Sequence, residues 1–369
     1  MRFSKALFLA AAACPLALSA QQADSFPKAP ELSGTLFGNY MYRTGKAAAG
    51  QNSFNFERAY LTVKDQLSAR VSARATLDVF DAGSGNGYVA RLKYGYLQYD
   101  YLKGENGLSA IARGGMLHTV FIDHEENFWP HYIAKTPTEL AGFFKSADLG
   151  AATLVTMPNK WGEIYAAVTN GATGGAAGGY TTPTDADRFK DYQGRLTLTP
   201  LASSEGFLKS FDLSGWYYKG AVARGNAVST SLDRSRWGVF AGVHDPRLTV
   251  GVDFAESMNA QSTGATTDTS ITGRLWSAYT TLRPFQLLTG NPCPFGIVLR
   301  YDQVKPSKDL DPSYSLFIGG VTVDLSKRAS FSVDYQAVDG RNLGGASPSS
   351  SVIGVSAPKA VYMHWVLNY

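Results

Sequence analysis

Residues 331–337 read Phe-Ser-Val-Asp-Tyr-Gln-Ala, with an apolar side chain at every odd position and a polar one at every even position. Successive side chains of a β-strand point to opposite faces, so this alternation predicts a strand with one apolar and one polar face. The pattern recurs at 69–79, 248–254 and 321–325, whereas the periodicity of amphipathic helices is almost absent. The chain is therefore expected to be all-β.

Marking every such segment predicts sixteen strands of about ten residues each, the length that a tilted strand needs to cross a bilayer. The predicted strands are residues 33–43, 54–65, 68–80, 88–101, 108–120, 147–157, 161–170, 189–200, 209–222, 234–244, 248–257, 271–283, 295–303, 315–325, 329–338 and 359–369. Lipid offers no hydrogen-bond partner to an open sheet edge. We therefore expect an antiparallel, up-and-down transmembrane β-barrel whose last strand pairs with its first.

The predicted connections alternate between short and long, as in outer-membrane barrels. Tight turns are expected at 66–67, 158–160, 245–247 and 326–328, and long loops at 171–188, 223–233, 258–270, 304–314 and 339–358. The connections at 201–208 and 284–294 are longer than ideal for the short side. The last strand ends on an aromatic, Tyr369, and aromatic residues near strand ends fit the girdles of a membrane barrel. The alternative is that they form the core of a soluble sheet.

The N-terminus has the layout of a secretory signal peptide at residues 1–20. Arg2 and Lys5 precede an apolar run that ends at Ala20, after which the sequence turns polar. A lipoprotein signal ending at Cys14 is the alternative. No linker divides the remainder, so residues 21–369 are expected to form one barrel domain, exported through the periplasm to the outer membrane.

Composition excludes several classes of protein. No later segment approaches the roughly 20 consecutive apolar residues of a membrane-spanning helix. Loss of the two cations in the signal lowers the formal charge from +4 to +2, which argues against nucleic acid as a partner. Of the two cysteines, Cys14 leaves with the signal and Cys293 has no partner. We expect no disulfide, no cysteine metal site and no cofactor.

One connection, residues 122–146, is acidic and aromatic where the others are rich in Gly and Ser. It is the longest predicted connection and the third on the long-loop side. We expect it to have a fixed shape with a short helical turn.

Three stretches resemble the phosphate-selective porins O and P and their broader porin relatives. They are residues 54–64 (Phe-Asn-Phe-Glu-Arg-Ala-Tyr-Leu-Thr-Val-Lys), 91–97 and 115–123, the last leading into 125–129. The family often has Pro where Val120 stands. The resemblance implies a sixteen-stranded porin, often a homotrimer, whose third long loop folds into the lumen. These motifs belong to the barrel wall, so they do not identify the solute.

A sixteen-stranded barrel is too wide for side chains to fill and encloses an aqueous channel. We expect small hydrophilic solutes and ions to pass through it, with outer-membrane lipid outside. Because a charge facing lipid is costly, charged strand residues are expected to point inward. This inward set includes Asp78, Arg195, Arg234, Arg236, Asp253, Arg300, Asp324 and Asp334.

The expected constriction has a basic wall and an acidic lip. The candidate residues are Arg58, Arg70, Arg74, Arg91, Lys93 and Arg113 on the wall, and Asp123, Glu125 and Glu126 on the loop. Opposed charges would make a transverse field typical of a general diffusion pore, whereas a net basic throat would select anions such as phosphate. Each cation has an alternative role in a salt bridge that stiffens the wall.

An enzyme and an adhesin are the other classes to consider. His124, Glu125 and Glu126 with His131 combine groups able to bind a metal or assist base chemistry, but their spacing matches no established motif. No G-x-S-x-G elbow, P-loop or Cys-His pair is present. We therefore expect neither a catalytic residue nor a metal site. A plugged structural barrel or adhesin would have larger insertions.

Overall fold

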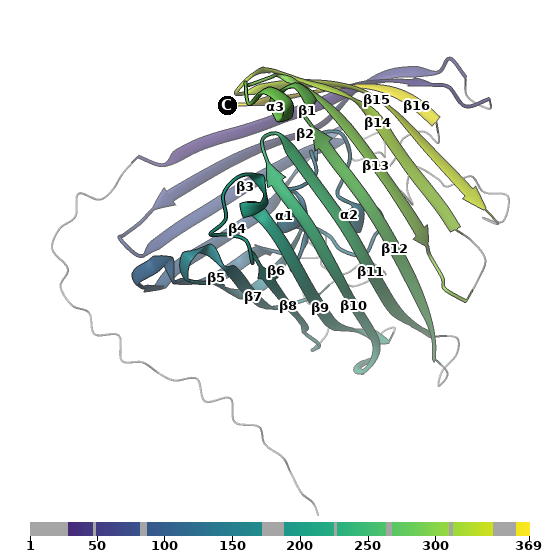
Figure 1. Ribbon diagram of the computed structural model, residues 1–369. Coiled ribbons are helices and arrows are strands. Elements are labelled where there is room, and N and C mark those ends of the chain that lie inside the picture. The colour runs from purple at the N-terminus through teal and green to yellow at the C-terminus, as the bar shows by residue number, and fades with distance from the viewer. Residues whose placement is uncertain are drawn as a thin grey trace, which may run out of the picture.

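The structure, a computed structural model, describes residues 29–46, 49–81, 87–171, 188–224, 227–262, 268–309, 313–341 and 359–369. Sixteen antiparallel strands form a closed barrel in which each strand pairs with its neighbours in sequence and β1 pairs with β16 (Figure 1). The expected fold class and strand number are confirmed. The predicted signal segment, residues 1–20, lies outside the described residues.

The strands follow the predicted order, and most of their ends lie within three residues of the predicted ones. They are β1 (Glu31–Arg43), β2 (Asn52–Gln66), β3 (Val71–Asp81), β4 (Tyr88–Lys103), β5 (Ser109–His118), β6 (Ala147–Thr156), β7 (Gly162–Thr169), β8 (Asp191–Leu198), β9 (Phe211–Arg224), β10 (Ala227–Asp245), β11 (Leu248–Ser262), β12 (Asp268–Leu282), β13 (Phe295–Lys305), β14 (Ser313–Ser326), β15 (Ala329–Arg341) and β16 (Lys359–Asn368). The helices are η1 (Glu105–Gly107), α1 (Ile122–Glu125), α2 (Pro137–Leu140), η2 (Pro158–Lys160), η3 (Phe207–Ser210) and α3 (Pro284–Thr289).

The first and last strands close the ring. Phe37 lies opposite Val366, and Gly38 lies opposite Trp365. A Cβ atom at Gly38 would come within 2.4 Å of the Asn55 backbone oxygen and 2.6 Å of the Trp365 ring. Glycine at this position therefore lets the indole of the last strand lie flat against the first strand.

The alternating strands separate an apolar outer face from a polar inner one. On β15 the even residues Ser332, Asp334 and Gln336 are buried inside the ring. Leu299 on β13 and Trp365 on β16 point outward and are 44% and 38% exposed. Among the described residues, no helix is long and apolar enough to cross a membrane. A continuous apolar outer surface of this kind matches a bilayer and not water.

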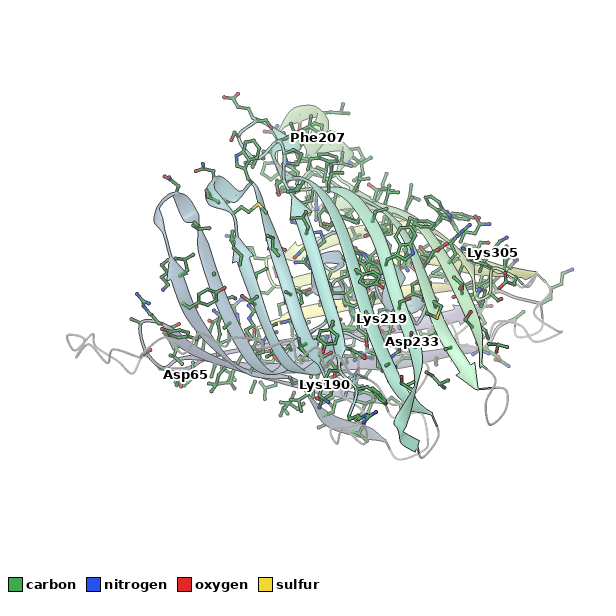
Figure 2. All side chains as sticks on the ribbon, turned by 90° about the horizontal axis from the view of Figure 1, so that it is seen from below. Asp65, Lys190, Phe207, Lys219, Asp233 and Lys305 are labelled. Carbon is green, nitrogen blue, oxygen red and sulfur yellow. The ribbon has the colours of Figure 1, made fainter. Side chains whose placement is uncertain are left out.

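The two ends of the barrel differ. Short connections such as 67–70, 246–247 and 327–328 join strands at one end, which Phe207 marks in Figure 2. Near the other end lies the ion pair between Lys219 and Asp233, with 2.9 Å between Nζ and Oδ2.

Three predicted long loops were partly wrong. Residues 223–233, 258–270 and 304–314 contain the ends of β9 to β14, because polar strand residues continue to pair beyond the apolar belt. Most of the predicted loops 171–188 and 339–358 lies outside the described residues.

The bilayer contact is tested by placing a charge on the outer face. We expect Leu299→Arg, in the middle of β13, to lower the free energy of unfolding in lipid vesicles by about 2–4 kcal/mol. Leu325→Arg, which is at the end of β14 and replaces a side chain that is 69% exposed, should cost about 0–1 kcal/mol. Denaturant titrations followed by tryptophan fluorescence give both values, and equal costs at the two depths would contradict the bilayer contact.

Candidate functional site

The segment between β5 and β6, residues 119–146, folds into the ring, where its helices α1 and α2 lie behind the front strands in Figure 1. The expected short helical turn is confirmed at both helices. Pro137 occupies the first turn of α2, where its fixed φ suits a helix and its missing N–H costs no hydrogen bond. We call residues 119–146 the inner loop.

Aromatic side chains dock the inner loop on one half of the inner wall. Phe121 stacks on Trp216 of β9 at 5.4 Å between ring centroids and meets Phe240 of β10 edge-on at 5.8 Å. Trp129 packs edge-on against Tyr279 of β12 at 5.8 Å. All five side chains are buried. Such pairs contribute about 0.5–1.5 kcal/mol each beyond the apolar area that they bury.

Polar side chains of the same part of the wall, on β8, β10, β13 and β15, form hydrogen bonds with the backbone of the inner loop. Four of them donate to its carbonyl groups: Arg195 to Val120 at 2.9 Å, Arg236 to Phe143 at 3.0 Å, Arg300 to Lys135 at 2.5 Å and Gln336 to Ile133 at 3.2 Å. A buried segment with little secondary structure needs such partners, because an unpaired carbonyl away from water is costly. The predicted inward direction of the three arginines is consistent with these contacts, and their role is to hold the loop.

Glu125 belongs to this docking contact. Its side chain is fully buried and accepts hydrogen bonds from the hydroxyl and the backbone N–H of Thr138, at 2.6 and 3.2 Å. Burial raises the pKa of Glu125 to about 7, despite those hydrogen bonds. The prediction that Glu125 lies on an open acidic lip was therefore wrong, because this side chain and that of Glu126 leave the helical turn on different sides.

Glu126 and Glu139 form the charged face of the inner loop that is turned toward β2 to β4. Burial by itself would raise the pKa of Glu126, but His131 and Lys93 outweigh it and lower the pKa to about 2. For Glu139 burial is likewise outweighed, and Lys135, His131 and Lys93 lower its pKa. Both carboxylates are thus ionised at neutral pH. Glu139 was missed in the sequence, where nothing sets it apart from other loop acids.

Asp123 lies at the edge of this loop face. Its carboxylate is 3.6 Å from the Arg195 guanidinium, and its side chain is 37% exposed. Asp123 is therefore the most open of the three predicted loop acids.

Two arginines on the facing wall share one buried carboxylate. Arg58 of β2 and Arg91 of β4 bind the same oxygen of Asp78, at 2.7 and 2.8 Å. Asp78 is fully buried, whereas the Arg58 and Arg91 side chains keep 16% and 20% of their surface exposed. Both arginines therefore direct their positive charge at the same buried carboxylate. Arg58 and Arg91 thus form salt bridges within the wall and also keep part of their surface exposed.

The other predicted cations of this wall lie over aromatic rings. Lys93 is 4.2 Å from the Tyr60 ring centroid, Arg74 is 4.8 Å from Tyr94, and Arg113 is 5.0 Å from Tyr96. Cation–π contacts hold long side chains flat against the wall, at about 0.5–1 kcal/mol each where water remains. Lys93, only 4% exposed, is the most covered of them.

Arg70 does not share this position. It precedes β3 in the turn at 67–70 and is exposed. Its predicted placement on the strand's inner face was wrong, because β3 begins at Val71, after the hydrogen bonds that Ser68 makes with residues 70 and 71.

A cavity of about 290 Å³ separates the inner loop from the facing wall. Glu57, Arg58 and Asp81 line it from the wall, and His131 and Lys135 line it from the loop. Charged side chains of both signs thus line a space that water and small solutes can occupy.

The predicted group of His124, Glu125, Glu126 and His131 is divided by the docking. His124 is buried beneath the loop, where its Nε2 lies 3.1 Å from the Ser214 hydroxyl. His131 instead lies beside Glu126 on the other face of the loop, with 3.1 Å between Nδ1 and Oε1. These four residues do not make one site.

Comparisons with solved structures match the barrel along nearly its whole length. The anion-selective porin from Comamonas acidovorans has a TM-score of 0.63 and 12% identity, over 92% of this chain and 99% of that one. The outer membrane channel DcaP of Acinetobacter baumannii has a TM-score of 0.61 and 12% identity, over 92% of this chain and 97% of that one. The trimer form of OmpT, an outer membrane protein of Vibrio cholerae, has a TM-score of 0.58 and 11% identity, over 92% of this chain and 98% of that one. At these identities the similarity establishes the fold.

Sequence comparisons add no relative. No family model matches the chain, and no curated protein matches it.

The docking of the inner loop is tested by removing its buried indole. Trp129→Ala should weaken docking by about 3–5 kcal/mol, because it deletes a fully packed ring. A loss of about 3 kcal/mol corresponds to roughly hundredfold faster amide exchange within 122–146 in mass-spectrometric hydrogen exchange. Trp276→Ala is the control, since that indole points outward and is 51% exposed. Equal loop protection in both variants would show that the aromatic contact does not hold the loop.

Proposed function

We propose that this protein is an outer-membrane channel for passive diffusion of small hydrophilic solutes and ions. One observation carries the proposal: the inner loop is bound to β8–β15, which leaves a cavity between it and the facing wall that is lined by charged side chains of both signs. The apolar outer face of the barrel, and the fold that it shares with porins and channels, support a location of the protein in the outer membrane.

The chemistry of such a passage follows from opposed charges. Glu126 and Glu139 on one side and Arg58 and Arg91 on the other produce a field across the path of the solute. A field of this kind orients dipolar molecules and disfavours apolar ones, whose entry would displace water from the charges without replacing its interactions. The predicted pore-lining set, corrected for Arg70 and Glu125, retains as partly exposed residues Arg58, Arg74, Arg91, Arg113, Asp123 and Glu126. Lys93 and the added Glu139 are covered by neighbouring groups and would act on the solute through their charge.

An anion-selective channel is the second candidate, and the excess of cations on β2–β5 favours it. Arg58 and Arg91 both bind the carboxylate of Asp78, and Arg74 and Arg113 lie over aromatic rings and form no ion pair with the described residues. One structural neighbour is described as an anion-selective porin, and the sequence resembles phosphate-selective porins. The loop carboxylates oppose an anion, so we place the general pore first.

Export, orientation and assembly complete the proposal. Residues 1–20 would be removed on export to the periplasm, and the end of the barrel with the short turns would face it. We propose a homotrimer, the form in which one structural neighbour is described.

An enzymatic role is not proposed. Ser214 and His124 pair a hydroxyl with an imidazole, but both are buried beneath the inner loop, beyond the reach of a solute.

Planar-bilayer recording under a salt gradient tests the channel and its ion preference. We expect open-channel conductance from the refolded protein. Replacing Arg74 and Arg91 by Gln should shift the reversal potential toward cation preference, because positive charge is removed from the solute path. Asp123→Asn with Glu126→Gln should shift it toward anions.

Arg328→Gln is the matched control, since this exposed arginine lies in the turn between β14 and β15. If Arg328→Gln shifts the reversal potential as much as the replacement of Arg74 and Arg91 does, Arg74 and Arg91 do not line the solute path. Lack of conductance from folded, inserted protein would contradict the channel itself.

A further inference from the structure

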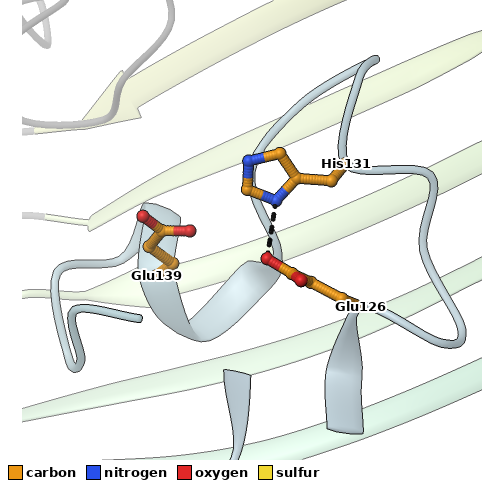
Figure 3. Close-up of side chains that lie close together, drawn as sticks. All are labelled: Glu126, His131 and Glu139. Atoms are coloured by element: carbon orange, nitrogen blue, oxygen red, sulfur yellow. Dashed lines mark ion pairs between the residues drawn. The ribbon is translucent and has the colours of Figure 1, made fainter. Parts of the chain in front are cut away.

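Three side chains of the inner loop converge on one point. Glu126 follows α1, His131 lies in the turn beyond it, and Glu139 comes from α2 (Figure 3). One potential ligand atom from each residue lies within 4.8 Å of the other two. His131 Nδ1 and Glu126 Oε1 are 3.1 Å apart.

All three converging atoms are buried, and one of them has no partner. Glu126 Oε1 and His131 Nδ1 form an ion pair at 3.1 Å, whereas Glu139 Oε2 makes no hydrogen bond. The Glu139 side chain is 7% exposed, and its nearest cation, Lys135 Nζ, is 3.6 Å from the other oxygen, Oε1. Buried polar atoms without partners are costly and uncommon in native proteins. A buried carboxylate oxygen without a partner, directed at an imidazole and a second carboxylate, indicates a cation that all three groups can bind.

We propose that Glu126, His131 and Glu139 bind a divalent transition-metal ion, with Zn²⁺ as the reference ion. An imidazole nitrogen with two carboxylate oxygens is a donor set that suits Zn²⁺ and its neighbours, whereas Ca²⁺ and Mg²⁺ prefer oxygen alone. Metal–ligand bonds of about 2.1 Å put ligand atoms of a tetrahedral ion about 3.4 Å apart. Small side-chain rotations are enough to reach that spacing from the present arrangement.

The three residues leave the fourth position of a tetrahedral ion for water or a solute. His131 also lines the cavity between the inner loop and the wall, so the ion would face that space. It would join the segment after α1 to α2 and neutralise two carboxylates of the loop face. The effect on ion preference rests on the proposed channel function, but the binding of the metal does not.

Metal binding is measured directly on the whole protein. Refolded protein without a histidine tag, in detergent micelles and chelator-treated buffer, is titrated with ZnCl₂ in a calorimeter. We expect one Zn²⁺ per chain, and Ca²⁺ at the same concentration should not compete. Glu139→Gln and His131→Gln should each weaken binding about tenfold or more, since loss of a neighbouring support alone costs that much at other metal sites.

Two further variants keep the test decisive. Glu205→Gln, in an exposed turn, should bind like the unaltered protein. Lys135→Gln should bind more tightly, because it removes the cation that competes for Glu139. Folding of each variant is checked by its heat-dependent mobility in gels. Stoichiometric binding that is absent, or unchanged in both ligand variants, would overturn the proposal.

Bilayer recordings separate the metal site from the channel. In the unaltered protein, Zn²⁺ should shift the reversal potential toward anions, and Glu139→Gln should abolish the shift. Zn²⁺ binding that depends on Glu139 without any change in conductance would support the metal site and contradict the placement of this face on the solute path.

Discussion

The docking of residues 119–146 on the inner faces of β8–β15 determines the rest of the interior. A loop of this length inside a barrel must bury its apolar side chains and pair its carbonyl groups, or it would remain in solvent at one end. The wall provides aromatic rings from β9, β10 and β12 and donors from β8, β10, β13 and β15. The loop therefore lies against this half of the wall, and a cavity of about 290 Å³ remains between it and the facing strands.

The charge distribution follows from this asymmetry. Arginines beneath the loop, such as Arg236 and Arg300, donate to its carbonyl groups and are buried. Arg58 on β2 and Arg91 on β4 instead bind the carboxylate of Asp78 and keep 16% and 20% of their side-chain surface exposed. Residues of the same type on neighbouring parts of one sheet thus have different roles, according to which half of the wall they occupy.

The barrel could be predicted from sequence because its rule is local. Lipid outside and polar groups inside impose a period of two on each strand. The sequence of a segment such as 329–338 therefore predicts both that it is a strand and which of its side chains face the lumen. The inner loop's shape follows no such period. The opposite directions of Glu125 and Glu126, and the approach of Glu139 to His131, depend on contacts with distant strands. Arg70 was misplaced because alternation continues through the turn before β3, where hydrogen bonds to Ser68 hold residue 70 outside the strand.

The most direct test of this account is the accessibility of single cysteines to a charged, membrane-impermeant thiol reagent. The background carries Cys293→Ser, because Cys293 is a free thiol. Arg74→Cys on the open wall should react rapidly, whereas Val298→Cys, fully buried beneath the loop, should react slowly if at all. Mass spectrometry of the labelled, folded protein gives both rates. Reaction of Val298→Cys as fast as Arg74→Cys would contradict a loop bound to β8–β15 with water on one side only.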